Sequence, residues 1–435
     1  MKYSDPDRRQ FLRGALTGAA AIAAWPAACT PSEKNDTATD VDFGAVLRAA
    51  RSEQERWQVV RDQFLLEPGY AYLNTGGLGP SPRQVIAAVD QAWRSLELRC
   101  ETGHGRRAAV RTQACEFFGC GEDTLAFTRN ATEGMNLVAR GLQFSSGDEI
   151  VMTTHEHPGG ALPWFALRED TGIRIRTVDP GAGGDDTLGR VANLLTARTR
   201  VVMVSHITCT AGLVMPVPEI ADLCRRRGVI CVVDGAQAVG QVPVDLRSLG
   251  CDFYVASGHK WLLAPKGTGL MYVREEMLDR WRPSYVGAYS DAGFDLVAGT
   301  FNRLRPASAS EYGTRSTPVL LGLAAAMDFL TTVGVDNAAT RGAYLANRLR
   351  AGLAPLNGVE ILTAAEPGWS AAILAFKLPE EGGNPWDWCN LLRTEHGMRL
   401  RPVGEAGLNV VRASTDVFNS ESEVDRLVEV LGTLL

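Results

Sequence analysis

Residues 229–273 read VICVVDGAQAVGQVPVDLRSLGCDFYVASGHKWLLAPKGTGLMYV and contain three strand-like runs. The runs cover residues 229–233, 253–256 and 269–273, and each is short, apolar and rich in β-branched or aromatic residues. This composition is typical of strands that are buried on both faces of a sheet. The first run leads into Asp234 and the second into SGHK, which ends at Lys260. Ligands of open α/β sheets bind beyond the carboxyl ends of the strands, so the pattern predicts an acid and a lysine at one binding edge.

The pairing of Asp234 with Lys260 indicates a particular cofactor. A lysine amine forms a Schiff base with a carbonyl cofactor. Pyridoxal phosphate also needs a carboxylate that keeps its ring nitrogen protonated, so that the ring accepts electrons. Asp234 suits the ring nitrogen, Lys260 suits the aldehyde, and Ser257 and His259 are placed to donate to the phosphate. The alternative is that Asp234 caps a helix and Lys260 is solvated.

The motifs DGAQAVG, CDFYVASGHKW and APKGTGLMYV resemble those of the class V aminotransferases. This family is a branch of the fold-type I pyridoxal-phosphate (PLP) enzymes, and it includes cysteine desulfurases and isopenicillin N epimerase-like proteins. The resemblance runs from about Tyr70 to the C-terminus. It implies PLP as cofactor and an α/β fold of type I. A large PLP-binding domain with a mostly parallel sheet is expected over residues 70–315, and a smaller C-terminal α+β domain over residues 316–435.

Composition narrows the class of partner. The chain has 435 residues, 45% hydrophobic and 22% charged, which is typical of a globular protein. Its formal net charge of −6 argues against nucleic acid as a main partner.

The first residues read as targeting sequence. Arg8 and Arg9 in DRRQFLR, followed by an Ala-rich stretch, resemble a twin-arginine signal peptide over residues 1–29. This predicts the twin-arginine translocase as an export partner and a periplasmic location. The residues before Cys29 partly match a lipoprotein cleavage box, so a lipid anchor on Cys29 and simple peptidase cleavage nearby both stay open. Residues 30–42 are polar and are expected to form a linker.

An N-terminal helical segment is expected over residues 43–69, with one amphipathic helix from Asp42 to Gln63. Residues 70–80, YAYLNTGGLGP, then predict a short strand that enters a Gly-rich turn. The family signature at this place lies near the active site, which makes Asn74 and Thr75 candidate pocket residues. A plain turn is the alternative.

A candidate phosphate site follows the strand expected at 124–128. The sequence RNATEG opens a helix, and free N–H groups at a helix start, together with the helix dipole, bind anions. Ala131 and Thr132 are the candidate phosphate ligands; an ordinary cap by Asn130 or Thr132 is the alternative. In the resembling family, the loop that matches EYGTR reaches the neighbouring subunit's phosphate. Thr314 in this loop therefore predicts a homodimer with shared sites.

The residues HEHPGG follow the strand expected at 149–153. The family places an aromatic or histidine ring here, stacked on the cofactor, and His157 matches that position. A metal pair of His155 and His157 is the alternative, but no third ligand is spaced nearby, so no metal is expected. Trp164 is a candidate for the pocket wall.

The turn after the strand expected at 200–205 departs from the desulfurase pattern. Desulfurases carry an asparagine there that bonds the cofactor's ring hydroxyl, and this chain has Cys209. Thr208 or Gln237 could supply the contact instead. A crossover helix over residues 218–227 is then expected, with Gly228 at its C-terminal cap.

Two arginines near the C-terminus are candidates for substrate binding. Arg412 stands where the resembling family has an arginine that binds the substrate carboxylate. A guanidinium suits this role because it offers a fixed fork of donors. Arg401 is a second candidate, and a surface ion pair is the alternative. The loop before Arg412 contains no cysteine, whereas desulfurases need one there to attack sulfur. Cys389 lies earlier, in an expected core helix, so sulfur mobilisation is discounted.

These features and the family resemblance predict an exported PLP-dependent enzyme, an aminotransferase acting on an amino-acid-like small molecule. The chain is also similar to exported PLP enzymes that tailor siderophore side chains, and this resemblance implies a secondary metabolite as substrate. Lys260 is expected to be the catalytic acid–base, with Asp234 and His157 as partners. Epimerisation of an amino acid is the next alternative, followed by desulfurase or lyase chemistry. A periplasmic binding lipoprotein is the alternative from another class; it would explain the signal and Cys29, but not the ordered cofactor motifs.

Overall fold

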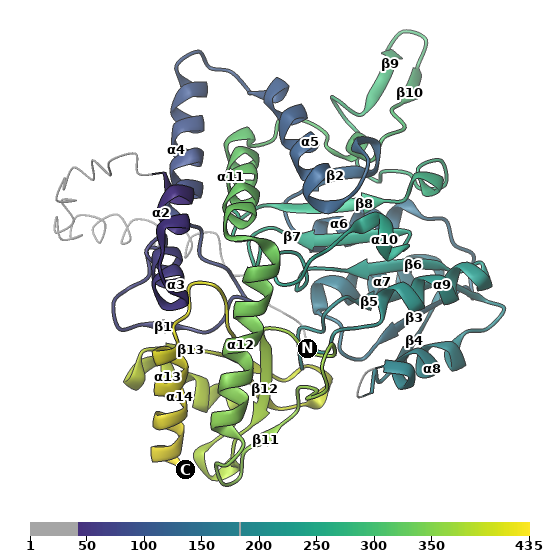
Figure 1. Cartoon of the computed structure of the whole chain (residues 1–435). Helices are drawn as coiled ribbons and strands as arrows, with labels where there is room; N and C mark the ends of the chain where they lie inside the picture. Colours follow the sequence, from purple (N-terminus) through teal and green to yellow (C-terminus); the bar gives the residue numbers. More distant parts are fainter. Residues whose placement is uncertain (1–41, 182–183) are drawn as a thin grey trace, which may run out of the picture. The chain divides into compact units, whose positions relative to one another are not determined.

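The computed structural model describes residues 42–181 and 184–435, and its largest sheet is built around the stretch quoted first (Figure 1). The seven strands lie in the order β2-β8-β7-β6-β5-β3-β4. They are β2 (Leu125–Thr128), β3 (Glu149–Thr153), β4 (Arg174–Val178), β5 (Thr199–Ser205), β6 (Ile230–Asp234), β7 (Phe253–Ser257) and β8 (Gly269–Val273).

Strands β4, β3, β5, β6 and β7 are parallel, whereas β8 runs antiparallel to both β7 and β2. Ser205 pairs with Asp234, and Asp234 pairs with Val255, so the carboxyl ends of β5, β6 and β7 meet at one edge. The expected strands at 124–128, 149–153, 200–205, 229–233, 253–256 and 269–273 are confirmed to within one residue at each end. The prediction of a mostly parallel sheet is also confirmed.

Helices connect these strands as a parallel sheet requires. They are α6 (Ala131–Gly141), α7 (Pro158–Thr171), α8 (Gly184–Leu194), α9 (Val217–Arg227) and α10 (Leu246–Leu249). Asn130 caps α6, because its side chain accepts a hydrogen bond from the backbone N–H of Glu133 at 2.8 Å. The crossover helix α9 ends as expected at Gly228, whose φ of +65° is the left-handed cap conformation that favours glycine.

The C-terminal part contains a second sheet, of four antiparallel strands in the order β11-β12-β15-β14. These are β11 (Glu360–Ile361), β12 (Ile373–Lys377), β14 (Arg401–Val403) and β15 (Val410–Ser414), and the associated helices are α12 (Val335–Leu353), α13 (Pro385–His396) and α14 (Glu421–Leu434). Their shared core includes Leu345, Leu374, Trp388 and Leu427. Residues 46–435 form one compact unit, and the division into two domains near residue 315 stays a prediction.

The remaining elements are α2 (Phe43–Ala49), α3 (Glu53–Arg61), β1 (Ala71–Tyr72), α4 (Arg83–Glu97), α5 (Arg107–Phe118), β9 (Asp291–Asp295), β10 (Thr300–Arg303), α11 (Thr317–Val333) and β13 (Met398–Arg399). The expectation of one helix from Asp42 to Gln63 is wrong. Ser52 caps a new helix, α3, by accepting a hydrogen bond from the Glu55 backbone N–H at 3.1 Å. An N-cap residue has extended backbone, and this breaks the helix between residues 49 and 53.

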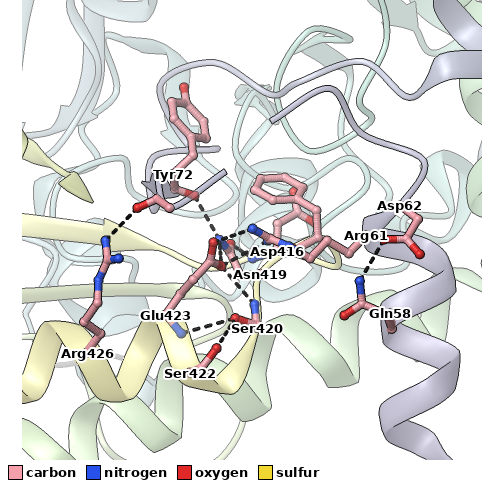
Figure 2. A network of polar contacts seen from close by, with 12 residues as sticks. Gln58, Arg61, Asp62, Tyr72, Asp416, Asn419, Ser420, Ser422, Glu423 and Arg426 are labelled. Carbon is pink, nitrogen blue, oxygen red and sulfur yellow. Dashed lines mark hydrogen bonds and ion pairs between the residues drawn. The ribbon is translucent and has the colours of Figure 1, made fainter. Parts of the chain in front are cut away.

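A polar network joins α3 and β1 to the segment that leads into α14 (Figure 2). Asn419 donates to the carbonyl oxygen of Tyr72 at 3.0 Å and to Glu423 at 3.1 Å, and Glu423 also pairs with Arg61 at 2.7 Å. Strand β1 in addition pairs with β13 in parallel. These contacts bring the segment after β1, which carries Asn74, beside the end of β15.

Within the described ranges, no single helix is both long and apolar enough to cross a membrane. Helices α11 and α12 would meet that criterion only as a pair, and they meet at a bend of 76°. The predicted signal peptide, Cys29 and most of the predicted linker lie outside the described residues.

Candidate active site

A cavity of about 270 Å³ opens at the carboxyl edge of the large sheet and collects most of the predicted site residues. It is lined by Gly76, Gly77, Asn130, Ala131, Thr132, His157, Gly159, Asp234, Ala236, Gln237, Ser257, His259, Lys260, Arg401 and Arg412. The contributing segments are the turn after β1, the start of α6, the start of α7, the ends of β6 and β7, and strands β14 and β15.

Asp234 and Lys260 are both buried in this cavity, as the ends of neighbouring strands should be. Asp234 accepts a hydrogen bond from the Ala236 backbone N–H at 2.9 Å, which fixes one carboxylate oxygen. Burial raises the pKa of Asp234, and the Lys260 charge opposes that rise. Burial likewise lowers the pKa of Lys260, opposed by the charge of Asp234. The lysine amine is therefore closer to its neutral, nucleophilic form than a solvated lysine is.

The start of α6 forms one wall of the cavity. The Ala131 backbone N–H donates to the Ser257 hydroxyl at 3.1 Å, so the helix start and the end of β7 are held together. Thr132 lines the cavity beside them. Asn130 caps the helix, so the predicted cap and the predicted phosphate site at the start of α6 do not exclude each other. His259 adds a buried ring Nδ1 that has no hydrogen-bond partner among the described residues. An exposed helix start beside unused donors suits an anionic group.

His157 projects into the cavity from the start of α7. Its Nδ1 accepts a hydrogen bond from the Gly159 backbone N–H at 3.0 Å, and the ring thereby caps α7. Burial first, and then the charge of Lys260, lower the pKa of His157 to about 4. The ring is therefore neutral near pH 7, with Nδ1 as its acceptor. A neutral flat ring suits stacking on an aromatic cofactor.

The candidates for the ring-hydroxyl contact differ in their availability. Thr208 is fully buried, and its hydroxyl accepts a hydrogen bond from Leu213 at 3.0 Å within its own turn. Gln237 lines the cavity; it donates to the Gly76 carbonyl at 2.8 Å and accepts from the Trp261 indole at 2.8 Å. The structure therefore leaves Gln237 as the better placed of the two.

Arg412 reaches the cavity from β15 and is 1% exposed. Its guanidinium donates to the Cys209 carbonyl at 2.6 Å and to the Asn74 side-chain oxygen at 3.1 Å. Its Nε has no partner among the described residues. Burial lowers the pKa of Arg412 to about 10, and the nearby charge of Arg401 acts in the same direction. The surface ion pair considered for Arg412 is wrong, because the side chain is buried.

Arg401 lies beside Arg412 and pairs with Glu405.

Two residues that the sequence suggested for the pocket, Thr314 and Trp164, do not line this cavity. Thr314 lines a separate groove of about 390 Å³ with Arg129, Lys266 and Arg315. Trp164 is wrong as a pocket wall: it is fully buried in the core of the large sheet, where its ring contacts Phe144 edge-on.

A metal centre is not supported within residues 42–181 and 184–435, where no group of three or more potential ligands gathers. His155 instead shares a hydrogen bond of 2.9 Å with the Thr210 hydroxyl.

Cys389 is buried in the C-terminal core, as expected, and burial raises its pKa to about 12.

Sequence reasoning missed three features of the site. Glu405 was not considered, because only the fold brings it to Arg401. Glu156 is buried between the ends of β3 and β5; burial raises its pKa to about 7, although the Ser205 and Thr153 hydroxyls donate to its carboxylate at 2.6 Å each. Gly159 was given no role, yet a Cβ there would lie 2.3 Å from the Thr132 hydroxyl oxygen. The GG pair after His157 was the available signal for this close approach.

The residues present fit PLP. The donors at the start of α6, the unpartnered His259 Nδ1 and the close packing at Gly159 form a cradle for a phosphate. Asp234 and Lys260 line the same cavity, with chemistry suited to the ring nitrogen and the aldehyde.

Comparisons with known proteins agree with this geometry. The family described as aminotransferase class-V matches residues 80–427. Isopenicillin N epimerase of Amycolatopsis lactamdurans is 32% identical over 397 residues, covering 87% of this chain and 98% of the relative. A cysteine desulfurase of Enterobacter sp. (strain 638) is 34% identical over 379 residues, covering 82% and 91%.

Solved structures give the same result. The apo cysteine desulfurase of Thermococcus onnurineus NA1 has a TM-score of 0.79 at 28% identity, covering 87% of this chain and 97% of that one. A mutant of C-DES with glycine covalently linked to its PLP cofactor has a TM-score of 0.78 at 28% identity, covering 86% and 98%. The fold is therefore that of fold-type I PLP enzymes. The chain belongs to the class V aminotransferase family and is a PLP-dependent enzyme.

Proposed function

We propose that this chain is an exported aminotransferase that acts on the amino group of an amino-acid-like small molecule or secondary metabolite. The observation that carries the proposal is the placement of Asp234, Lys260 and Arg412 around one buried cavity. An acid, a nucleophilic amine and a carboxylate anchor are together what an amino-acid substrate of a PLP enzyme requires.

Each residue has a definite part in this proposal. When bound, PLP withdraws electrons from the substrate carbon that carries the amine. Asp234 would keep the ring nitrogen protonated, and Ala131, Thr132, Ser257 and His259 would hold the phosphate. His157 would lie against the ring, and Gln237 would supply the contact with its hydroxyl. Lys260 moves the proton at the substrate carbon, and its lowered pKa favours the neutral amine that this step needs. Arg412, supported by Asn74, orients the carboxylate.

Epimerisation is the second candidate, favoured by the 32% identity to isopenicillin N epimerase over nearly its full length. One experiment separates the two reactions. The purified holoprotein is incubated with a panel of amino compounds, with and without a keto-acid acceptor, in deuterated water. Transamination yields at most one oxo product per active site without the acceptor and many with it; epimerisation yields, without any acceptor, the amino compound inverted at the reacting carbon and carrying deuterium there. If neither product forms with any member of the panel, while sulfide is released from cysteine, both candidates are excluded.

We also propose a homodimer in which Thr314 serves the phosphate of the partner subunit. Thr314 lines a separate groove and not the cavity of its own chain. The segment beside this groove exposes many large apolar side chains, namely Tyr285, Val286, Phe294, Leu296, Val297 and Phe301. Exposed apolar patches of this kind mark interaction surfaces.

The shared site is tested by mixing two inactive variants, Lys260→Ala and Thr314→Arg, under conditions that exchange subunits. Some hybrid dimers then carry one site with both native residues, and activity returns in part. A monomer by light scattering, or no rescue despite proven exchange, contradicts the shared site.

Export is proposed from the motif that contains Arg8 and Arg9 and from the Ala-rich stretch that follows it. Replacement of both arginines by lysine should retain the protein in the cytoplasm, which cell fractionation measures. Replacement of Cys29 by serine tests the lipid anchor, since only an anchored protein would leave the membrane fraction.

A further inference from the structure

Two arginines of the candidate active site lie opposite each other on neighbouring strands. Arg401 on β14 and Arg412 on β15 are direct partners across an antiparallel strand pair, and both line the cavity. Side chains in such a pair lie about 5 Å apart at Cβ, and like charges directly opposite each other are destabilising. An arrangement of this kind is stable when anions lie close to both groups.

The two arginines are compensated in different ways. Arg412 bonds two neutral acceptors, the Cys209 carbonyl and the Asn74 amide oxygen, and no carboxylate pairs with it among the described residues. Arg401 has a carboxylate partner, Glu405, four residues along the chain. Each arginine also has a buried nitrogen with no partner in the described part of the chain: Nη1 of Arg401 and Nε of Arg412.

Glu405 is held against Arg401 by a short loop between β14 and β15. Within this loop Ala406 has φ +56° and Asn409 has φ +51°. The left-handed region costs a residue with a side chain roughly 1–2 kcal/mol, and such strain concentrates at functional sites. The side chain of Glu405 is 22% exposed, so water reaches it. Burial alone would raise the pKa of Glu405, but a backbone hydrogen bond and the Arg401 charge hold it below its usual value.

We propose that Glu405 is a resident counter-anion, and that the site takes amino substrates with two negative groups. One group binds Arg412, and the second replaces Glu405 at Arg401. This inference rests on the proposed function and names the substrate class of the same site: amino acids with a second acidic group.

The physical reason is that the exchange of carboxylates at Arg401 costs little free energy. Replacing one carboxylate by another at Arg401 keeps that charge compensated, and the displaced Glu405 regains its hydration because it is partly exposed already. A substrate with a neutral side chain cannot make this exchange and gains only the contact with Arg412. Charge-assisted hydrogen bonds are about twice as strong as neutral ones, so the preference should be measurable.

The competing interpretation is that Arg401 and Glu405 form a fixed pair that only stiffens the loop. Under that interpretation Arg401 is never available, and substrates with one or two acidic groups bind alike. The two interpretations therefore differ in a quantity that can be measured without any turnover.

The experiment titrates the holoprotein with acids that lack an amine, so that no reaction follows. Succinate, glutarate and adipate are each compared with the monocarboxylate of the same carbon number by calorimetry. We expect the best dicarboxylate to bind wild type about tenfold more tightly than its monocarboxylate counterpart. In Arg401→Gln this advantage falls below about twofold, and in Glu405→Gln dicarboxylate binding strengthens about three- to tenfold because the internal competitor is gone.

The double variant, Arg401→Gln with Glu405→Gln, is expected to match Arg401→Gln alone, because Glu405 acts only through Arg401. Glu360→Gln, which removes one partner of the exposed Lys377–Glu360 pair, is the matched control and should leave both affinities unchanged. Retained cofactor absorbance shows that each variant is folded; if Arg401→Gln is not, Arg401→Lys replaces it and should keep a reduced advantage.

Equal binding of both acid classes to wild type overturns the proposal, and so does a dicarboxylate advantage that survives in Arg401→Gln. A dicarboxylate affinity that is unchanged in Glu405→Gln overturns the counter-anion role of Glu405. Failure of the proposed function is a separate result: no amino compound would then be turned over, whatever the binding of these unreactive acids.

Discussion

The two ends of the cavity are built in different ways. At the cofactor end, Asp234 and Lys260 follow directly from neighbouring parallel strands, within one short stretch of sequence. At the substrate end, Asn74 bonds Arg412 across 338 positions of the chain, and Arg412 bonds Cys209 across 203. The cofactor end is therefore fixed by one rigid sheet, whereas the substrate end depends on the docking of distant segments.

The two ends also differ in their electrostatics. The cofactor end has buried acids with raised pKa, Asp234 and Glu156, close to one lysine. The substrate end has two arginines and one carboxylate, Glu405. Variants at the cofactor end should abolish the reaction, and variants at the substrate end should shift affinity. The following predictions sharpen or break this contrast.

Lys260→Ala should give the largest effect. Loss of the amine removes both the covalent attachment of the cofactor and the group that moves the substrate proton, so turnover should fall by at least about 10³-fold. Borohydride treatment and peptide mapping of wild type should place the cofactor on the Lys260 peptide. Lys377→Ala removes a lysine on the surface and is the matched control. A cofactor found on any other lysine contradicts the assignment.

Asp234→Asn should lower kcat by roughly 10²- to 10³-fold, because a neutral amide cannot hold the proton on the ring nitrogen. The cofactor should remain bound, since Lys260 and the phosphate donors are unchanged. Stopped-flow kinetics and the absorption spectrum of the bound cofactor check the two parts. An active Asp234→Asn variant would show that another group performs this task.

Arg412→Lys should mainly change affinity. Lysine keeps the charge but loses the fork of donors, so KM for a carboxylate substrate should rise about 10- to 100-fold while kcat changes less. The same amine without its carboxylate is the control substrate, and its KM should not respond to the variant. A large fall in kcat with unchanged KM would place Arg412 in the chemical step and break the contrast.

Glu156→Gln should give the smallest effect, seen in stability against pH. The folded pKa of about 7 lies above the unfolded value, so the stabilising contribution is present at low pH and is lost as pH rises toward 7 and beyond. Between pH 5 and 8, cofactor-free wild type should lose about 1–3 kcal/mol more of its unfolding free energy than the variant does. Urea unfolding at several pH values measures this difference, with exposed Glu380→Gln as control. Parallel curves for wild type and Glu156→Gln would contradict the raised pKa.

The sequence alone predicted the central pair of the cofactor end, Asp234 and Lys260, but not Glu156 or the close approach at Gly159. Strand runs that terminate at Asp234 and at SGHK predicted the parallel sheet, its binding edge and the residues that reach the cavity from it. This succeeds because the carboxyl ends of neighbouring parallel strands must meet, whatever the rest of the chain does. The prediction of one helix from Asp42 to Gln63 was wrong for a local reason, since the capping property of Ser52 outweighed the apolar periodicity on which the prediction rested.

The substrate end required the tertiary structure. Arg412 and Asn74 were named from a resemblance, but their segments are brought together by tertiary contacts: the network around Asn419, the pairing of β1 with β13 and the bridge between Asn74 and Ser414. Trp164 was assigned to the pocket because an aromatic residue near the motif suits either a wall or a core, and burial decided for the core. Glu405 carries no motif, and its importance comes entirely from lying at Arg401 across from Arg412. Local sequence specifies which strand end a side chain follows, whereas contacts between distant segments depend on packing that no local pattern records.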